Sequence, residues 1–101
     1  MQIDVDKITG LGEYECAGWG GRKLYSVPGG KAFLVLSERT MEVRTDLKLG
    51  EKLQEEYESV MGSRYFGRGG IEVVLSGQLP QDEVEDLIRL SYNMTRDGEY
   101  I

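Results

Sequence analysis

The sequence contains no histidine and a single cysteine, and both shortages argue against whole classes of site. Histidine is the commonest general acid–base group and metal ligand, so its absence argues against most hydrolases and zinc enzymes. Cys16 can form no disulfide within the chain, and without a histidine to activate it we interpret it as a buried or idle thiol. We therefore expect a protein that is not an enzyme and that holds no metal and no cofactor.

Long apolar runs are missing as well. No run approaches the roughly 20 residues that span a bilayer, and residues 1–4 carry no basic, hydrophobic targeting signal, so we expect a cytoplasmic protein without a membrane partner. The chain has 101 residues, of which 40% are apolar and 30% charged. This length and composition predict a single folded domain over residues 1–101.

The net charge of −6 is unevenly distributed. Residues 19–50 hold six basic side chains against three acidic ones, whereas residues 51–60 and 77–101 are acidic. Since we expect the basic segment to be sheet and the acidic segments to be mostly helix, the two layers would carry opposite charge if they face opposite sides of the molecule. A mixed, solvated surface is the alternative.

Three segments in the first half have the pattern of strands. Residues 23–27 are expected to be extended, residues 32–36 form a short apolar run, and the turn at Pro28-Gly29-Gly30 separates these two segments. In residues 41–45, Met41, Val43 and Thr45 alternate with charged residues. Residues 71–76 alternate again and predict a fourth strand. The glycine-rich stretches at 18–21, around Trp19, and at 66–70 are expected to be loops or a hairpin tip.

Two helices are predicted in the second half. Apolar residues at intervals of four, four and three predict an amphipathic helix over 47–60, and a second helix opens at Pro80 and ends near Asp97. On this second helix, Ser91 is expected to bond the carbonyl one turn back. Residues 3–11 fit a short helix or an irregular segment equally well. The order of elements implies an α+β fold, with a largely antiparallel sheet and helices packed on one face.

Short motifs between residues 22 and 95 resemble the MmcQ/YjbR family. They are Gly29-Gly30-Lys31-Ala32-Phe33, Val43-Arg44-Thr45-Asp46, Leu75-Ser76-Gly77, Leu79-Pro80, and Leu87-Ile88 followed by Ser91-Tyr92. The resemblance implies a CyaY-like (frataxin-like) domain of the double-wing type, presumed to bind DNA. The resemblance implies a longer amino-terminal helix. Here only about 18 residues precede the sheet, so we expect this helix to be short or missing. The family's His, Lys and Trp pattern corresponds to residues 65–70, where Arg68 is the substitute cation, and Lys31 is the lysine of the Gly-Lys-x-Phe hairpin.

The first functional hypothesis is a nucleic-acid-binding module. Basic residues on hairpins and sheet would contact phosphates, and Trp19, Tyr65 and Phe66 would stack on bases. The candidate binding residues are Arg22, Lys23, Lys31, Arg39, Arg64 and Arg68. Because the net charge repels polyanions at long range, only a concentrated basic patch would bind DNA, and its affinity would fall with salt.

Two alternatives remain open. A protein-interaction or regulatory domain would use an apolar groove or an exposed sheet edge, and a homodimer through Trp19 or Tyr25 is one form of it, so a monomer and a homodimer are both possible. A weak metal site is suggested by Glu51, Glu55 and Glu58, which would share one helix face. An ordinary solvated helix explains the same acidic pattern.

Overall fold

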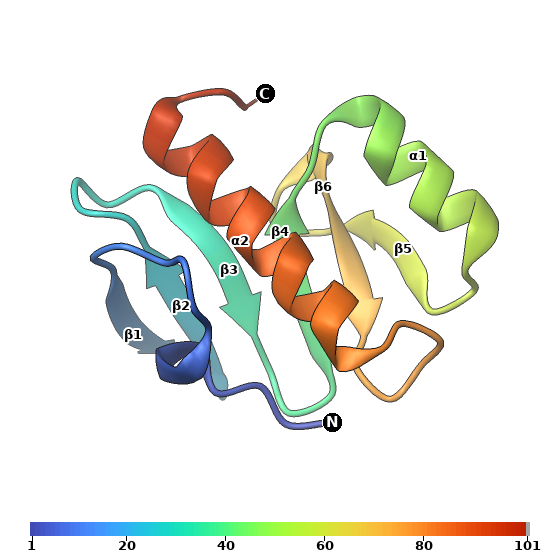
Figure 1. The fold of residues 1–101 in the computed structure, drawn as a ribbon, viewed down its shortest axis with the longest axis horizontal. Coiled ribbons are helices and arrows are strands. Elements are labelled where there is room, and N and C mark those ends of the chain that lie inside the picture. Colours follow the sequence, from blue (N-terminus) through green and yellow to red (C-terminus); the bar gives the residue numbers. More distant parts are fainter. Residues whose placement is uncertain (101) are drawn as a thin grey trace.

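The computed structural model describes residues 1–100, which form a six-stranded antiparallel sheet and two α-helices (Figure 1). The strands are β1 (Glu15–Trp19), β2 (Arg22–Ser26), β3 (Ala32–Leu36), β4 (Thr40–Arg44), β5 (Val60–Ser63) and β6 (Gly67–Val74), and the helices are α1 (Leu47–Glu56) and α2 (Gln81–Asp97). The strands lie in the order β1-β2-β3-β4-β6-β5. Neither α-helix of the described residues has the length and apolar composition needed to cross a membrane.

Both helices pack on the same face of the sheet, with α2 over β3 and β4 and α1 over β6 and β5 (Figure 1). Strand alternation sets which side chains they cover. Met41 and Val43 of β4 are fully buried with Val73 of β6 and Ile88 of α2 in one core. Glu42, between Met41 and Val43, points to the face that no helix covers. The expected α+β fold with helices on one face is therefore confirmed.

The amino-terminal segment contains one short turn of helix, which decides between the two structures that its sequence allowed. The 3₁₀ helix η1 (Val5–Lys7) is capped by Asp4, whose side chain accepts a hydrogen bond from the Asp6 backbone N–H. Val5 and Ile8 are buried in the core beneath this turn. Four apolar side chains anchor the segment although it forms no longer helix: Ile3, Val5, Ile8 and Leu11.

Two strands were not predicted, and both lie at edges of the sheet. β1 includes Gly18 and Trp19 of the segment 18–21 that was expected to be a loop, whereas Gly20 and Gly21 do form a turn. β5 begins at Val60 within the predicted helix 47–60. α1 ends at Glu56 because Tyr57 adopts an extended conformation (φ −129°). β6 begins at Gly67, so the stretch at 66–70, expected to be a loop or hairpin tip, belongs mostly to a strand. β1 and β5 were missed because edge strands need not show apolar alternation: every residue of β1 is exposed. The start of β6 was missed because three of its first four residues are glycine, which is depleted in strands.

Ser91 connects α2 to the sheet where β3 and β4 separate. The register between these strands pairs Leu34 with Val43 and does not continue to Phe33 and Arg44. There the Ser91 hydroxyl donates to the Phe33 carbonyl (2.6 Å) and accepts from the Arg44 N–H (2.8 Å). The structural role expected for Ser91 is correct, but its partners are different. The bond to a carbonyl one turn back is made by Thr95, whose hydroxyl donates to the Ser91 carbonyl.

Candidate functional site

The uncovered face of the sheet carries one row of side chains, aligned across five strands by their register. The row contains Leu24, Val35, Glu42, Glu72 and Met61, so that two glutamates lie directly opposite each other on β4 and β6. Glu42 is only 3% exposed and Glu72 only 6%, although no helix lies over them. Like charges in directly opposing positions destabilise a sheet. The two carboxylates therefore need partners, which other parts of the chain supply.

Glu42 is held by donors from the two hairpins at the edges of the sheet. Its Oε1 accepts hydrogen bonds from the Ser63 hydroxyl (2.8 Å) and the Tyr65 N–H (2.9 Å), and its Oε2 lies 3.5 Å from the Arg22 guanidinium. Arg22 begins β2, whereas Ser63 ends β5 and Tyr65 lies in the turn between β5 and β6. Glu42 thus links the β1–β2 hairpin to the β5–β6 turn across the uncovered face.

Glu72 has a second arginine as its partner. The Nε atom of Arg64 lies 3.4 Å from its Oε1 atom, and the Arg64 side chain is 82% exposed. The carboxylate end of this pair is buried and only the guanidinium end is exposed, so solvent screens the pair only in part. Arg64 is therefore close to a carboxylate and still open to a second anionic partner from solvent.

Aromatic rings lie between these arginines. Trp19 and Tyr65 meet edge to face with ring centroids 5.3 Å apart, and Tyr65 meets Phe66 at 4.9 Å. The Arg22 guanidinium lies over the Trp19 ring at 4.3 Å. Trp19 and Tyr65 are 43% and 41% exposed, which is unusual for large aromatic residues. Trp19, Arg22, Arg64 and Tyr65 line a depression of about 280 Å³, and we call these four residues the aromatic–arginine face.

Arg44 lies on the same side of the sheet and was not among the predicted site residues. Its guanidinium is 4.7 Å from the Phe66 ring and 4.1 Å from the Tyr100 ring, and its Nε donates to the Ala32 carbonyl. Burial lowers the pKa of this guanidinium from its ordinary value, and no carboxylate of residues 1–100 forms an ion pair with it. The sequence could have indicated this residue, because Arg44 follows the buried Val43 on a strand whose other face is open to solvent.

The structure brings together only two of the six predicted nucleic-acid-binding residues, Arg22 and Arg64. Lys31 lies in the hairpin before β3 and Arg39 in the turn after it, so they occupy opposite ends of that strand. Lys23 follows Arg22 on β2 and therefore points to the opposite face of the sheet. The proposed patch of six cations is thus divided among several surfaces.

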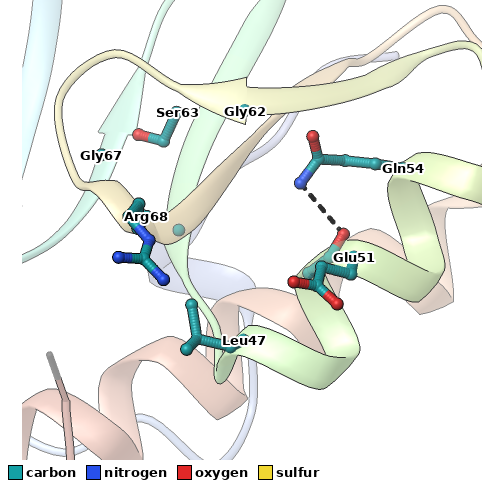
Figure 2. Close-up of a pocket in the computed structure, with 9 residues that line it drawn as sticks. Leu47, Glu51, Gln54, Gly62, Ser63, Gly67 and Arg68 are labelled. Atoms are coloured by element: carbon teal, nitrogen blue, oxygen red, sulfur yellow. Dashed lines mark hydrogen bonds between the residues drawn. The ribbon is translucent and has the colours of Figure 1, made fainter.

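Arg68 lies on the helix side of the sheet. It lines a cavity of about 410 Å³ together with Leu47, Glu51 and Gln54 of α1. Figure 2 shows its guanidinium extending from β6 toward Leu47 in the first turn of that helix. The cation that takes the place of the family's basic pattern is therefore separated from the aromatic–arginine face.

The acidic helix face and the cysteine also differ from expectation. Glu58 lies beyond the end of α1, so it cannot share a helix face with Glu51 and Glu55. Within residues 1–100, no three acidic or cysteine side chains are grouped as a metal site requires. Cys16 is exposed on β1 and not buried. Tyr25, opposite Cys16, is buried, which removes it from any homodimer contact.

Two tyrosines near Cys16 have raised pKa values. Burial, followed by the contact with the Cys16 thiol, raises the pKa of Tyr25 above its ordinary value. The Tyr14 hydroxyl donates to the Asp6 carboxylate, and this hydrogen bond is the main cause that raises the pKa of Tyr14 to about 12. Both phenols remain protonated at neutral pH. They join the amino-terminal segment to the sheet, which is a structural role.

Comparison of the chain with protein-family models, curated proteins and solved structures finds no match. The function of this protein is therefore inferred from its own residues.

Proposed function

We propose that this domain is a non-catalytic module that binds single-stranded nucleic acid on its aromatic–arginine face. The observation that carries the proposal is the placement of two exposed aromatic rings, Trp19 and Tyr65, between Arg22 and Arg64 on a sheet face that no helix covers. Stacking of a base on such a ring contributes about 1–3 kcal/mol and tolerates any base. Arginine forks match the geometry of phosphate oxygens.

The shape of the face favours a single strand over a duplex. The Trp19 and Tyr65 rings are inclined by 75° to each other and border a depression of about 280 Å³. Bases of a duplex are stacked inside the helix and cannot reach these rings without being extruded. An unpaired base has a free face for Trp19 or Tyr65, and its flanking phosphates would then lie near the arginines.

The charge of the protein limits the strength of binding. The net charge of −6 repels a polyanion, and Glu42 and Glu72 partly neutralise Arg22 and Arg64. With Arg44 included, three cations are available for phosphates on this side of the sheet. For a single strand, each neutralised phosphate contributes about −0.7 to the slope of log K against log salt, so we expect a slope of roughly −2.

The resemblance to the MmcQ/YjbR family, which we retain as a proposal, supports the same class of ligand. Members are presumed to bind DNA, and an antiparallel sheet with helices on one face is compatible with the arrangement that the resemblance implies. The residues carried over from that family are Lys31 and Arg68, which lie apart from the aromatic–arginine face. They therefore serve as controls for the proposed site.

Trp19 is the only tryptophan, so its fluorescence reports directly on the site. The protein is titrated with a short oligothymidylate and with a duplex of equal length, at about 50 and 200 mM salt, the range over which phosphate contacts weaken strongly. We expect the single strand to quench the fluorescence and to bind more weakly at high salt. By anisotropy of a labelled strand, Tyr65→Ala should weaken binding by roughly 5- to 100-fold, the equivalent of one lost stacking contact.

The control variants are Arg68→Gln and Lys31→Gln, which should bind the oligothymidylate as the parent does. If these variants lose binding while Tyr65→Ala retains it, the ligand site lies on the basic hairpins instead. If neither nucleic acid changes the Trp19 fluorescence at low salt, the proposal is wrong.

A further inference from the structure

A groove is lined by residues of both helices. The helices lie on the face of the sheet opposite the aromatic–arginine face (Figure 1). The groove has a volume of about 350 Å³. Its floor is apolar and is formed by Leu49, Leu53, Tyr57, Leu79, Leu87 and Leu90. The groove exists because α2 lies over the central strands β3 and β4 while α1 lies over β6 and β5, at the edge of the sheet.

The floor of this groove is only partly covered by the protein itself. Leu49, Leu53 and Tyr57 pack against the core but remain partly exposed. Leu90 is also partly exposed and is not among the side chains that pack against the core. Partly exposed apolar side chains from two helices thus lie together, and a partner that removed them from water would be bound favourably.

The charges around the groove select the kind of partner that can cover it. Its rim carries Glu56, Glu83 and Asp86 against Lys52, whose ammonium is 3.9 Å from the Glu56 carboxylate. Asp86 is paired with Arg89 at 2.6 Å, whereas Glu83 has no ion pair among the described residues. The helices as a whole are acidic, with two lysines against three glutamates in α1 and two arginines against five carboxylates in α2.

We propose that this groove docks a basic, amphipathic helix of another protein. The apolar side of such a helix, with side chains at positions i, i+4 and i+7, would cover the leucine floor, and its lysines and arginines would meet the acidic rim. A second copy of this chain is a poor occupant, because its own amphipathic helices are acidic and would be repelled. The docking site is separate from the nucleic-acid site and does not depend on it.

The proposal is tested with two synthetic helical peptides of about 14 residues, which share leucines at positions i, i+4 and i+7. One peptide has lysine at its remaining polar positions, and the other has glutamate. Amide NMR spectra of the labelled full-length chain locate the binding surface, and anisotropy of labelled peptide gives the affinity. We expect the lysine peptide to bind, with shifts confined to residues around Leu53 and Leu90, and the glutamate peptide not to bind.

Variants of two exposed or partly exposed residues separate the contributions of charge and apolar contact. Glu83→Lys and Leu90→Gln should each weaken binding of the lysine peptide by at least about fivefold. Asp82→Lys is the matched control: it makes the same charge change one residue away, in the same helical turn, at a side chain that does not line the groove. This control should bind the peptide as the parent does, and all three variants should still bind oligothymidylate if the parent does.

Three results would overturn the proposal. The first is the absence of peptide-induced shifts along the groove. The second is equal binding of the glutamate peptide, which would show that the rim does not select charge. The third is a concentration-dependent dimer, seen by sedimentation, in which Leu53 and Leu90 become protected, because a second copy would then be the occupant.

Discussion

Replacing Ser91 with alanine should strongly destabilise the protein, because its hydroxyl bonds two strands of the sheet. The Ser91 side chain is fully buried, and its oxygen is inserted between Phe33 of β3 and Arg44 of β4, where the ladder between these strands has opened. Alanine removes a donor and an acceptor at once. The Phe33 carbonyl and the Arg44 N–H both lose a partner inside the protein.

The structure sets the size of the effect. Each hydrogen bond contributes about 1 kcal/mol net, and a buried polar group left without a partner costs about 1–3 kcal/mol. Two affected backbone groups therefore predict a loss of about 2–6 kcal/mol in the free energy of unfolding. For a domain of this size, each kcal/mol lowers the melting temperature by roughly 4–8 °C, so we expect a decrease of at least about 8 °C.

Urea unfolding followed by circular dichroism measures this loss, and Thr95→Val is the matched control. Thr95 is also buried on α2, but its hydroxyl donates to the Ser91 carbonyl, a local bond within the helix, so its loss should cost under about 1 kcal/mol. Amide exchange at Arg44 should rise in Ser91→Ala only. If Ser91→Ala is no less stable than the control, β3 and β4 have closed to bond each other directly, and the reasoning fails.

Three further changes test the site and its surroundings. Glu72→Gln frees Arg64 from its ion pair and should raise oligothymidylate affinity a few-fold in the fluorescence titration, whereas weaker binding would mean that the pair positions the guanidinium for phosphate. Gly70→Ala places a Cβ atom against a backbone oxygen of β4 and should cost about 1–3 kcal/mol in urea unfolding; unchanged stability would show that the strands can separate there. Tyr14, with its pKa raised to about 12, contributes stability that is fully present below the ordinary tyrosine pKa of 10.0 and is lost as pH rises from there toward 12, because the unfolded chain ionises first. In Asp6→Asn, an absorbance titration should find the pKa of Tyr14 closer to 10.0; an unchanged value would assign the shift to burial.

The central part of the fold was predictable because its residues alternate between a core and an open face. β4 and the part of β6 after Gly70 alternate, β3 is a continuous apolar run, and α2 has a helical apolar period. On α2, the predicted inner positions Val84, Leu87 and Ile88 are buried. Where a segment packs on one side against a continuous core, the period of the sequence determines its structure.

The edges of the sheet were not predictable in this way. β1 has no buried residue, so no apolar period marks it, and it is held by backbone pairing to β2. β5 is four residues long and contains Gly62, and the helical spacing of Tyr57 and Val60 continues the pattern of α1 past its true end. Backbone pairing depends on the neighbouring strand and leaves little trace in the sequence of the edge strand itself.

The candidate site depends on those same edges, which is why its residues could be identified individually but not as a group. Trp19 and Arg22 come from the β1–β2 hairpin and Arg64 and Tyr65 from the β5–β6 turn, at the two ends of the strand order. They meet because Glu42, in the middle of the sheet, binds groups from both hairpins.

Glu42 also shows where the rule of alternation fails. A glutamate between two core residues of a strand predicts a solvated carboxylate, yet this one is almost completely buried. It is bonded instead to the Arg22 guanidinium, the Ser63 hydroxyl and the Tyr65 N–H. Burial of a charge is costly unless it is paired and hydrogen-bonded, as it is here. A stable fold could place an apolar residue at this position at lower cost. The carboxylate does what an apolar side chain could not: it accepts the Tyr65 N–H and pairs with Arg22, and so it fixes one ring and one cation of the aromatic–arginine face relative to each other.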